Sequence, residues 1–211
     1  MAATSSTAGG TDHWERRYRE RRADELSWTE AAPTASLELI AAARLPRQAG
    51  ILDAGGGAAG LAAALSQAGY TDLTVADISA AALARARAGL GERAAAIIWV
   101  EADLRDHDFG RRFELWHDRA AFHFMVTEAD REGYLRTLER SLAPGGHLVL
   151  AGFGPAGPSE CSGLPVARRD AEEIAALLGD GYALVSSHPH QHRTPSGAVQ
   201  EFVYAHFQRR R

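Results

Sequence analysis

A glycine-rich turn between a predicted strand and a predicted helix is the strongest constraint in this sequence. The segment ILDAGGGAAGLAAAL covers residues 51–65. Glycine permits positive φ and leaves no Cβ between a ligand and the start of the helix. Gly55, Gly57 and Gly60 also have the G-x-G-x-x-G spacing of dinucleotide-binding turns. The segment predicts an α/β fold with a nucleotide-like ligand, but the glycines alone do not select that ligand.

Strand and helix patterns alternate along most of the chain. We expect strands at 50–54, 73–77, 95–100, 113–117 and 146–153, and helices at 61–68, 79–90, 128–142 and 171–178. Such alternation is typical of a doubly wound, mostly parallel sheet between helices. Two closing strands, 182–187 and 199–207, joined by a loop at 188–198, are expected to form an antiparallel hairpin at the C-terminal edge.

The composition indicates one globular domain. Of 211 residues, 45% are hydrophobic and 24% are charged, which is ordinary for a chain that buries a full core. Residues 1–12 read as a disordered tail, and residues 13–211 as one domain. Within it we distinguish an N-terminal helical part at 13–46, a ligand-binding core at 50–153, and a part at 154–211 that completes the sheet and a substrate pocket.

Charge and hydropathy narrow the classes of partner. The formal net charge of -4 does not favour nucleic acid, whose phosphates require clustered Lys and Arg. We see neither a signal peptide nor a run of about 20 apolar residues, the length that a membrane span needs. The lone cysteine, Cys161, has no internal disulfide partner. We therefore expect a cytoplasmic monomer or homodimer that acts on a small-molecule substrate.

Asp53, two residues before the first glycine, bears on the choice of ligand. Its carboxylate would repel a diphosphate and attract a cation. S-adenosylmethionine carries a sulfonium and an ammonium group and has no phosphate, so it fits this position. The alternative is that Asp53 only caps the turn through backbone N–H groups.

Two further acids stand at the ends of the next predicted strands. Asp77 in VADIS is placed to accept both ribose hydroxyls of an adenosine, with an N-cap of the helix near Ser79 as the alternative. Asp103 in EADL is placed to accept the adenine amino group. Ile78 and Leu104 would form apolar walls. Together with Asp53 these residues predict an adenosine-containing ligand.

Over residues 50–153, the motifs ILDAGGG, VADIS, EADL and PGGHLVL resemble class I S-adenosylmethionine-dependent methyltransferases. The resemblance implies a Rossmann-like, seven-stranded sheet with an antiparallel last strand. It implies S-adenosylmethionine as cofactor and S-adenosylhomocysteine as product. It also implies that Asp53, Gly55 and Gly57 surround the methionine end, with Asp77 on the ribose and Asp103 on the adenine.

The resemblance extends to segments outside the core. HWERRYRERRADELSW and CSGLPV look like features of a bacterial subgroup, and the N-terminal tryptophans are similar to those of thiol and thiopurine methyltransferases. A W-x-x-R-Y start is equally similar to protein-lysine methyltransferases. Trp14 and Trp28 are thus expected to cover the cofactor, with ordinary helix packing as the alternative. Ala59 stands where many members have another glycine, which affects the backbone geometry of the turn.

The segment FELWHDRAAFHFM contains the expected chemistry, because family members place residues near the transferable methyl group there. His117 is expected as a general base, with Asp118 orienting it or accepting a proton itself. His123 is a further catalytic candidate, with a core histidine as the alternative. Arg119 and Cys161 are expected near the substrate. The alternative for Arg119 is a surface ion pair, and the alternative for Cys161 is a thiol without a function.

A metal site is not expected. His188, His190 and His192 alternate in SSHPHQHRT and would share one side of an extended segment, which suggests zinc. The proline and the loop-like composition favour a solvated linker instead.

The sequence therefore predicts methyl transfer, which mainly requires in-line positioning of nucleophile, methyl and sulfur. By analogy, a thiol or another soft nucleophile is the favoured small acceptor. The alternatives are a protein-lysine or other N- or O-methyltransferase, an NAD(P) oxidoreductase, and a non-catalytic nucleotide-binding subunit.

Overall fold

The main strands and helices follow the predicted alternation. The computed structural model describes residues 9–30, 32–58 and 60–211. The strands of the main sheet are β1 (Gly50–Ala54), β2 (Asp72–Asp77), β3 (Ile97–Glu101), β4 (Phe113–Arg119), β5 (Leu142–Phe153), β8 (Tyr182–Arg193) and β9 (Val199–Arg209). The α-helices are α1 (Thr11–Glu20), α2 (Thr34–Ala42), α3 (Leu61–Gln67), α4 (Ala80–Leu90), α5 (Glu128–Ser141) and α6 (Ala171–Leu178).

The seven strands form one sheet in the order β3-β2-β1-β4-β5-β9-β8. β1, β2, β3, β4 and β5 pair in parallel, whereas β9 runs antiparallel to both β5 and β8. The predicted Rossmann-like sheet with an antiparallel C-terminal hairpin is thus confirmed. The order reverses direction between β1 and β4, and in such sheets a ligand binds at this point, beyond the carboxyl ends of the strands.

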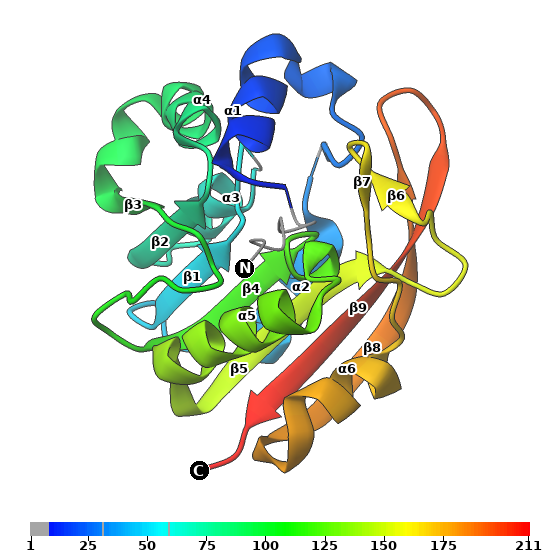
Figure 1. Cartoon of the computed structure of the whole chain (residues 1–211). Helices are drawn as coiled ribbons and strands as arrows, with labels where there is room; N and C mark the ends of the chain where they lie inside the picture. The colour runs from blue at the N-terminus through cyan, green and yellow to red at the C-terminus, as the bar shows by residue number, and fades with distance from the viewer. Residues whose placement is uncertain (1–8, 31, 59) are drawn as a thin grey trace, which may run out of the picture.

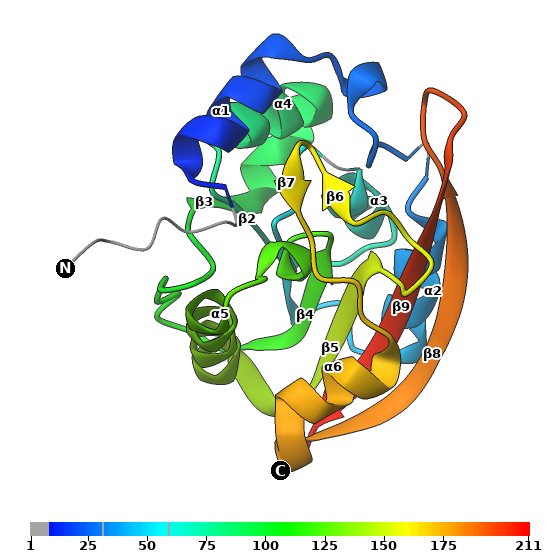
Figure 2. The same ribbon diagram turned by 45° about the vertical axis from the view of Figure 1, so that its right-hand side comes forward.

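Helices cover both faces of the sheet (Figures 1 and 2). α5 and α6 lie on the near face in Figure 1, and α2 lies behind the sheet, where it contacts α3, β5 and β9. The core follows from this layering. Trp116, fully buried in β4, faces α5 and donates a hydrogen bond from Nε1 to the Tyr134 hydroxyl at 2.9 Å.

Helix starts follow local sequence signals. Ser79 accepts a hydrogen bond from the amide of Ala82 at 3.1 Å and so caps α4, close to the predicted start of that helix. In α6, Asp170 and Glu173 form a reciprocal capping box. None of the helices in the described ranges combines the length and the apolar character that crossing a membrane requires.

The structure differs from the predictions at three places. α1 begins at Thr11, so the end of the expected tail is helical, and residues 1–8 lie outside the described residues. Residues 154–165, where the glycines, prolines and serines of the sequence predict a loop, contain a small antiparallel pair, β6 (Glu160–Cys161) and β7 (Leu164–Pro165). β8 continues through Arg193, so the expected linker is largely strand, and it pairs residue by residue with β9.

Candidate active site

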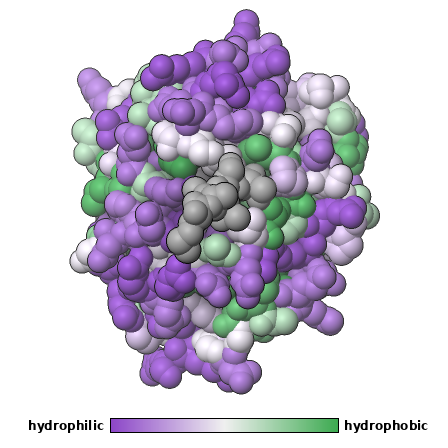
Figure 3. Space-filling view, viewed as in Figure 1, coloured by the Kyte–Doolittle hydropathy of each residue, from purple (hydrophilic) through white to green (hydrophobic). Residues whose placement is uncertain are grey.

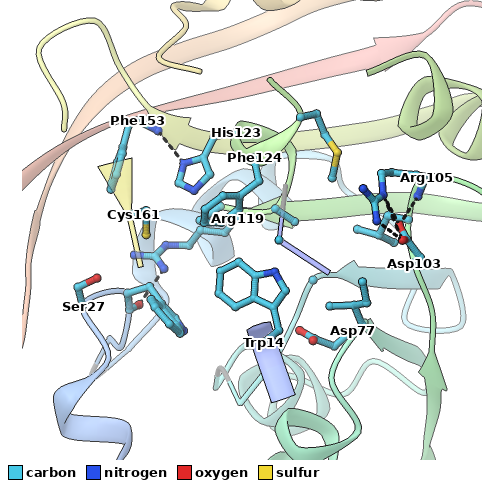
Figure 4. A pocket seen from close by; sticks show the side chains of 18 of the residues that line it. Trp14, Ser27, Asp77, Asp103, Arg105, Arg119, His123, Phe124, Phe153 and Cys161 are labelled. Atoms are coloured by element: carbon cyan, nitrogen blue, oxygen red, sulfur yellow. Dashed lines mark hydrogen bonds and ion pairs between the residues drawn. The ribbon is translucent and has the colours of Figure 1, made fainter. Parts of the chain in front are cut away.

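Two cavities adjoin the carboxyl ends of β1, β2 and β4. The larger cavity, of about 840 Å³, brings most of the predicted site residues together (Figure 4). Those residues are Trp14, Trp28, Gly55, Asp77, Ile78, Asp103, Leu104, Arg119, His123 and Cys161. The smaller cavity, of about 700 Å³, is lined by Asp53 and His117 among others. Tyr18, Trp28, Gly55 and Arg119 line both cavities, so the two spaces adjoin along a shared wall.

Asp77 ends β2 and lies in the wall of the larger cavity (Figure 4). Its Oδ1 accepts a hydrogen bond from the amide of Ser79 at 2.8 Å. The side chain is buried, and this burial raises the pKa of Asp77 to about 7, against the opposing hydrogen bonds from Ser79 and Gly57. Asp77 therefore changes charge near neutral pH, which makes any hydrogen bonding to it dependent on pH.

Asp103 follows β3 and is held by Arg105, a residue that the sequence analysis did not single out. Arg105 Nε donates to Asp103 Oδ1 at 2.8 Å, and its Nη1 donates to Asp130 Oδ1 at 2.9 Å. Burial alone would raise the pKa of Asp103, but the hydrogen bonds and charge of Arg105 outweigh it and lower that pKa. The carboxylate stays ionised and fixed in orientation at this end of the cavity.

The glycine-rich turn adopts the backbone geometry that its sequence predicts. Gly55 and Gly57 have φ angles of 69° and 52°, in the left-handed region that favours glycine. A Cβ at Gly57 would collide with the Tyr18 hydroxyl and would lie 3.3 Å from Asp77 Oδ2. Gly60 differs, because a Cβ there would meet nothing within 4 Å. The prediction about Ala59 falls on a residue outside the described ones.

Asp53 and His117 form a buried pair beside the smaller cavity. His117 Nδ1 lies 2.8 Å from Asp53 Oδ1, and its Nε2 lies 2.9 Å from the Ser36 hydroxyl on α2. His117 is only 3% exposed. The second oxygen of Asp53, Oδ2, is buried without a hydrogen-bond partner among the described residues. An unpaired buried carboxylate oxygen is costly, and a cationic N–H group would satisfy it.

The expected pairing of His117 with Asp118 is wrong. Both residues lie within β4, where successive side chains point to opposite faces of the sheet. Asp118 faces α5, where its Oδ2 accepts from the Tyr134 hydroxyl at 2.7 Å and its Oδ1 from the amide of Ala121 at 2.9 Å. His117 is oriented by Asp53 instead. Asp118 is fully buried and lines neither cavity, so it stabilises the turn after β4.

The N-terminal segment closes one side of the larger cavity with aromatic rings. The Trp14 ring lies edge-on to Phe124 at 4.9 Å and to Trp28 at 6.1 Å between centroids. Tyr18 is buried and packs edge-on against Trp28 at 6.0 Å. Figure 3 shows the outer surface over α1 as hydrophilic. α1 therefore turns its aromatic side chains inward over the larger cavity, and the role of Trp14 and Trp28 in covering a cofactor stays a prediction.

Hydrogen bonds fix α1 in this position. Glu15 accepts from the amide of Ala81 at 3.2 Å, which holds α1 at the N-terminus of α4. Arg85 on α4 donates to the backbone oxygens of Tyr18 and Arg21. The covering segment is thus attached to the same helix that follows Asp77.

Arg119 connects this segment to the sheet. Its guanidinium donates to the Trp28 oxygen at 2.9 Å and to the Tyr204 hydroxyl at 3.0 Å, and it pairs with Glu30 at 3.0 Å. It also lies over the Phe202 ring, 4.8 Å from the centroid. The alternative of a surface ion pair is wrong, because the Arg119 side chain is only 10% exposed.

The far end of the larger cavity is aromatic with few polar atoms. His123, from the turn after β4, packs on Phe153 at 4.9 Å, and Phe153 packs on Phe202 at 4.9 Å. Cys161 from β6 lies in the same wall (Figure 4) and is buried, which raises the pKa of its thiol. His123 Nε2 and Gln200 Oε1 are buried without hydrogen-bond partners among the described residues.

Several lining residues escaped the sequence analysis. Tyr18 and Phe124 had a weak signal, because one lies four residues after Trp14 and the other follows His123. Gln200 and Phe202 had none, because β9 joins the site only through the sheet order. The remaining residues in this group are Gly9, Ser27, Ala102, Arg105, Ala120, Ala121, Met125 and Phe153.

The three alternating histidines lie in β8, on one face of the sheet. His188 stacks on Tyr204 with ring centroids 5.8 Å apart, and His192 Nε2 contacts the Ser27 oxygen at 2.6 Å. Within the described residues, no group of His, Cys, Asp and Glu is arranged to hold a metal ion. The solvated-linker interpretation is wrong for His192, which is buried.

Comparisons with known proteins agree with this geometry. Residues 51–146 match the family model described as a methyltransferase domain. A protein of echinomycin biosynthesis, associated with conversion of a disulfide bond into a thioacetal group, superposes with a TM-score of 0.74. The two are 24% identical over 95% of this chain and 93% of that chain.

Two further structures have the same fold over almost their whole length. The SAM-dependent methyltransferase from Anabaena variabilis has a TM-score of 0.72, with 16% identity over 95% of both chains. The N-methyltransferase NodS from Bradyrhizobium japonicum, in complex with S-adenosyl-L-homocysteine, has a TM-score of 0.68. It is 19% identical over 97% of this chain and 99% of that chain. The chain therefore has the Rossmann-like fold of these structures, and residues 51–146 match the methyltransferase-domain model.

Proposed function

We propose that this protein is an S-adenosylmethionine-dependent methyltransferase for a small acceptor, with a thiol or another soft nucleophile favoured. The cofactor is S-adenosylmethionine, in keeping with the methyltransferase-domain match. The observation that carries the proposal is the buried Asp53 Oδ2, which lacks a partner among the described residues beside the glycine-rich turn. The ammonium group of the methionine end fits this oxygen, whereas a dinucleotide diphosphate does not.

The two cavities accommodate the two ends of such a cofactor. Asp77 and Asp103 would bind the ribose and adenine in the larger cavity, with Ile78 and Leu104 as apolar walls. Gly55 lines both cavities, so the cofactor would pass over it and place the methionine end beside Asp53. The bound cofactor would supply an electrophilic methyl group, and the protein would hold it without covalent chemistry of its own.

The far end of the larger cavity favours an acceptor that is not a cation. Its acids, Asp77 and Asp103, lie at the opposite end, and no other Asp or Glu among the described residues lines this cavity. Arg119 contributes a positive charge, and the remaining wall is largely aromatic. An ammonium group must lose a proton before it attacks, and this end provides no carboxylate to bind it. A thiol forms its nucleophilic anion far more readily.

The residues of this chain contribute positioning and exclusion of water. Trp14, Trp28 and Phe124 cover the cofactor side, which keeps the nucleophile, the methyl carbon and the sulfonium sulfur in line and dry. A thiolate sulfur forms the new carbon–sulfur bond as the bond to the sulfonium breaks, giving a thioether and S-adenosylhomocysteine. We assign acceptor contacts to Arg119, Cys161 and His123. His117 would act by orienting Asp53.

The experiment is methyl transfer from labelled S-adenosylmethionine to matched small acceptors, together with calorimetric titration of S-adenosylhomocysteine. Thiophenol, phenol, benzoate and benzylamine share an aromatic body and differ in the attacking atom. We expect labelling of thiophenol above all. Activity confined to benzylamine or to protein lysines would overturn the acceptor proposal. Binding of NAD(P) in place of S-adenosylhomocysteine would support the oxidoreductase alternative, and cofactor binding without turnover of any acceptor would support a non-catalytic subunit.

A further inference from the structure

His123 is the buried titratable group at the far end of the larger cavity. It is 2% exposed, and its ring lies in the cavity wall beside Phe153, near Cys161 and Arg119 (Figure 4). The other histidine of this region, His117, has both ring nitrogens occupied. His123 has one nitrogen without a partner among the described residues, and that nitrogen is Nε2.

The surroundings of His123 determine which nitrogen carries the hydrogen. The backbone N–H of Phe153 points at Nδ1 over 3.5 Å, so Nδ1 is the acceptor. The neutral ring then carries its hydrogen on Nε2. The hydrogen of Nε2 is therefore a buried donor that no described residue satisfies. Leaving such a donor unpaired is costly, which is the mark of a site that a ligand completes.

The charged groups around His123 keep it neutral. Burial, reinforced by Arg119 from β4 and Arg169 from the segment before α6, lowers the pKa of His123 to about 3. Cys161, which belongs to β6 and lies in the same cavity wall, is a neutral thiol because burial raises its pKa. A histidine in this setting does not accept a proton at neutral pH, so if His123 contributes to catalysis, as the sequence predicts, it does not do so as a general base.

Gln200 provides a second unpaired polar atom in the same wall. Its Oε1 is buried without a partner among the described residues, and it lies on β9 two residues before Phe202. Phe153, Phe202 and Phe124 form the apolar surface around these groups. Two unpaired polar groups within an aromatic end indicate a binding site for a molecule with an apolar body and a polar reacting group.

We propose that His123 binds the methyl acceptor as a neutral hydrogen-bond donor, with Nε2–H directed at a lone pair of an uncharged or anionic acceptor. This rests on the proposed function and specifies its substrate class. The site selects a nucleophile that presents a lone pair, such as a thiolate, and rejects an ammonium group, which would point a hydrogen at the Nε2 hydrogen and stand near Arg119. Gln200 Oε1 is an acceptor, so it binds an N–H or O–H group carried elsewhere on the same molecule.

The test measures thiophenol binding to the whole protein already saturated with S-adenosylhomocysteine, by calorimetry, with benzylamine as the cationic counterpart. His123→Phe keeps a ring and removes the donor, and His123→Gln restores an N–H at similar reach. We expect His123→Phe to weaken thiophenol binding about tenfold, equivalent to ~1.4 kcal/mol, and His123→Gln to recover most of it. His107→Phe, outside both cavities, is the matched control and should leave binding unchanged.

A second readout follows the His123 ring directly. Nitrogen-15 NMR of labelled imidazoles should show hydrogen on Nε2 and no titration of His123 between pH 5 and 9. Titration near the ordinary histidine pKa, equal thiophenol affinity in wild type and His123→Phe, or preferred binding of benzylamine would each overturn the proposal. Failure of S-adenosylhomocysteine to bind at all would instead refute the proposed function, so the two failures are distinguishable.

Discussion

The two cavities beside Gly55 share part of their wall, and each contains buried polar atoms without a hydrogen-bond partner among the described residues, but only in the smaller cavity is such an atom a carboxylate oxygen. In the larger cavity, Asp103 is already neutralised by Arg105, and the far end is aromatic. In the smaller cavity, Asp53 keeps one buried oxygen without a partner among the described residues. From this difference we infer that the smaller cavity suits a charged group, whereas the larger cavity suits flat, mostly apolar groups held by a few hydrogen bonds.

Arg119 makes the comparison sharper because it lines both cavities. Its partner Glu30 lines only the smaller cavity, so the ion pair offsets the charge of Arg119 on that side of the wall. Arg119 is paired with Glu30 and not with Asp53, whose partner is His117. Substitutions in the smaller cavity and substitutions in the larger cavity should therefore affect cofactor binding in different ways.

The largest effect should come from the smaller cavity. Asp53→Asn removes the charge that we assign to the cofactor ammonium, and it should weaken S-adenosylhomocysteine binding about 100-fold in calorimetry, within the range measured for buried charge pairs. Asp72→Asn is the control. Asp72 lies at the start of β2, at the opposite end from Asp77, and pairs with Arg111, so this variant removes a charge outside both cavities. That control should bind normally, and an equal loss in both variants would contradict the comparison.

The shared turn should show the next largest effect. Gly57→Ala places a methyl group against the Tyr18 hydroxyl at a backbone φ of 52°. We expect the free energy of unfolding to fall by ~1–3 kcal/mol, with weaker cofactor binding. Chemical denaturation measures the first quantity. In Gly60→Ala, in the same turn, the added methyl group meets open space, so the free energy of unfolding should hardly change. Similar losses of stability in both variants would show that the close approach of Tyr18 to Gly57 is not the cause.

The larger cavity should show a moderate dependence on pH. If Asp77 binds the ribose as we propose, its ionised form would accept hydrogen bonds from both ribose hydroxyls, whereas its protonated form would accept fewer. Because burial raises the pKa of Asp77 to about 7, S-adenosylhomocysteine affinity should fall about tenfold as pH decreases from 8 to 6. Asp77→Asn should remove this dependence. An unchanged pH profile in that variant would place the titrating group elsewhere.

The same group has the opposite effect on the ligand-free protein. The folded state retains a proton on Asp77 that the unfolded chain has released between pH 4 and 7. The contribution of Asp77 to folding stability therefore falls as pH rises through that window. Thermal unfolding of wild type and Asp77→Asn at pH 5 and pH 8 would compare the two, and Asp77→Asn should gain stability relative to wild type at pH 8.

The smallest effect should come from the far end. Cys161 is buried and lies away from Asp77 (Figure 4), and it does not line the smaller cavity, where Asp53 lies. Cys161→Ala should leave S-adenosylhomocysteine affinity within about twofold and cost ~1 kcal/mol of stability or less. Calorimetry and denaturation measure these quantities. A large loss of cofactor affinity would mean that the cofactor extends to the far end of the larger cavity. The cofactor end and the far end of that cavity would then not be separate binding regions.

The sequence predicted the sheet well wherever hydrophobic periodicity and turn residues agreed. The strands before Asp103 and around Asp53 and Asp77 could be placed because each is a short apolar run followed by, or ending near, a carboxylate, and β1 and β2 are buried almost throughout. β8 was cut short because Pro189 and three histidines suggest a loop. β8 is a sheet edge, and an edge strand tolerates a proline that a central strand would reject.

The site was predicted less completely for two physical reasons. Ending β4 at His117 concealed the alternation that separates His117 from Asp118, whereas a strand that continues to Arg119 puts them on opposite faces. Contacts such as Asp103 with Arg105, or His117 with Ser36, depend on side-chain geometry that no periodic pattern reports. Gln200 joins the cavity only because β9 lies beside β5.

The position of β9 also determines when this protein can acquire its site during synthesis. β9 follows β8 in the chain but lies between β5 and β8 in the sheet. Until β9 has left the ribosome, β8 has no neighbour to pair with, and Gln200 and Phe202 are absent from the cavity wall. A nascent chain can thus form the β1-to-β5 half of the sheet early, but the far end of the larger cavity is completed only after β9 has emerged.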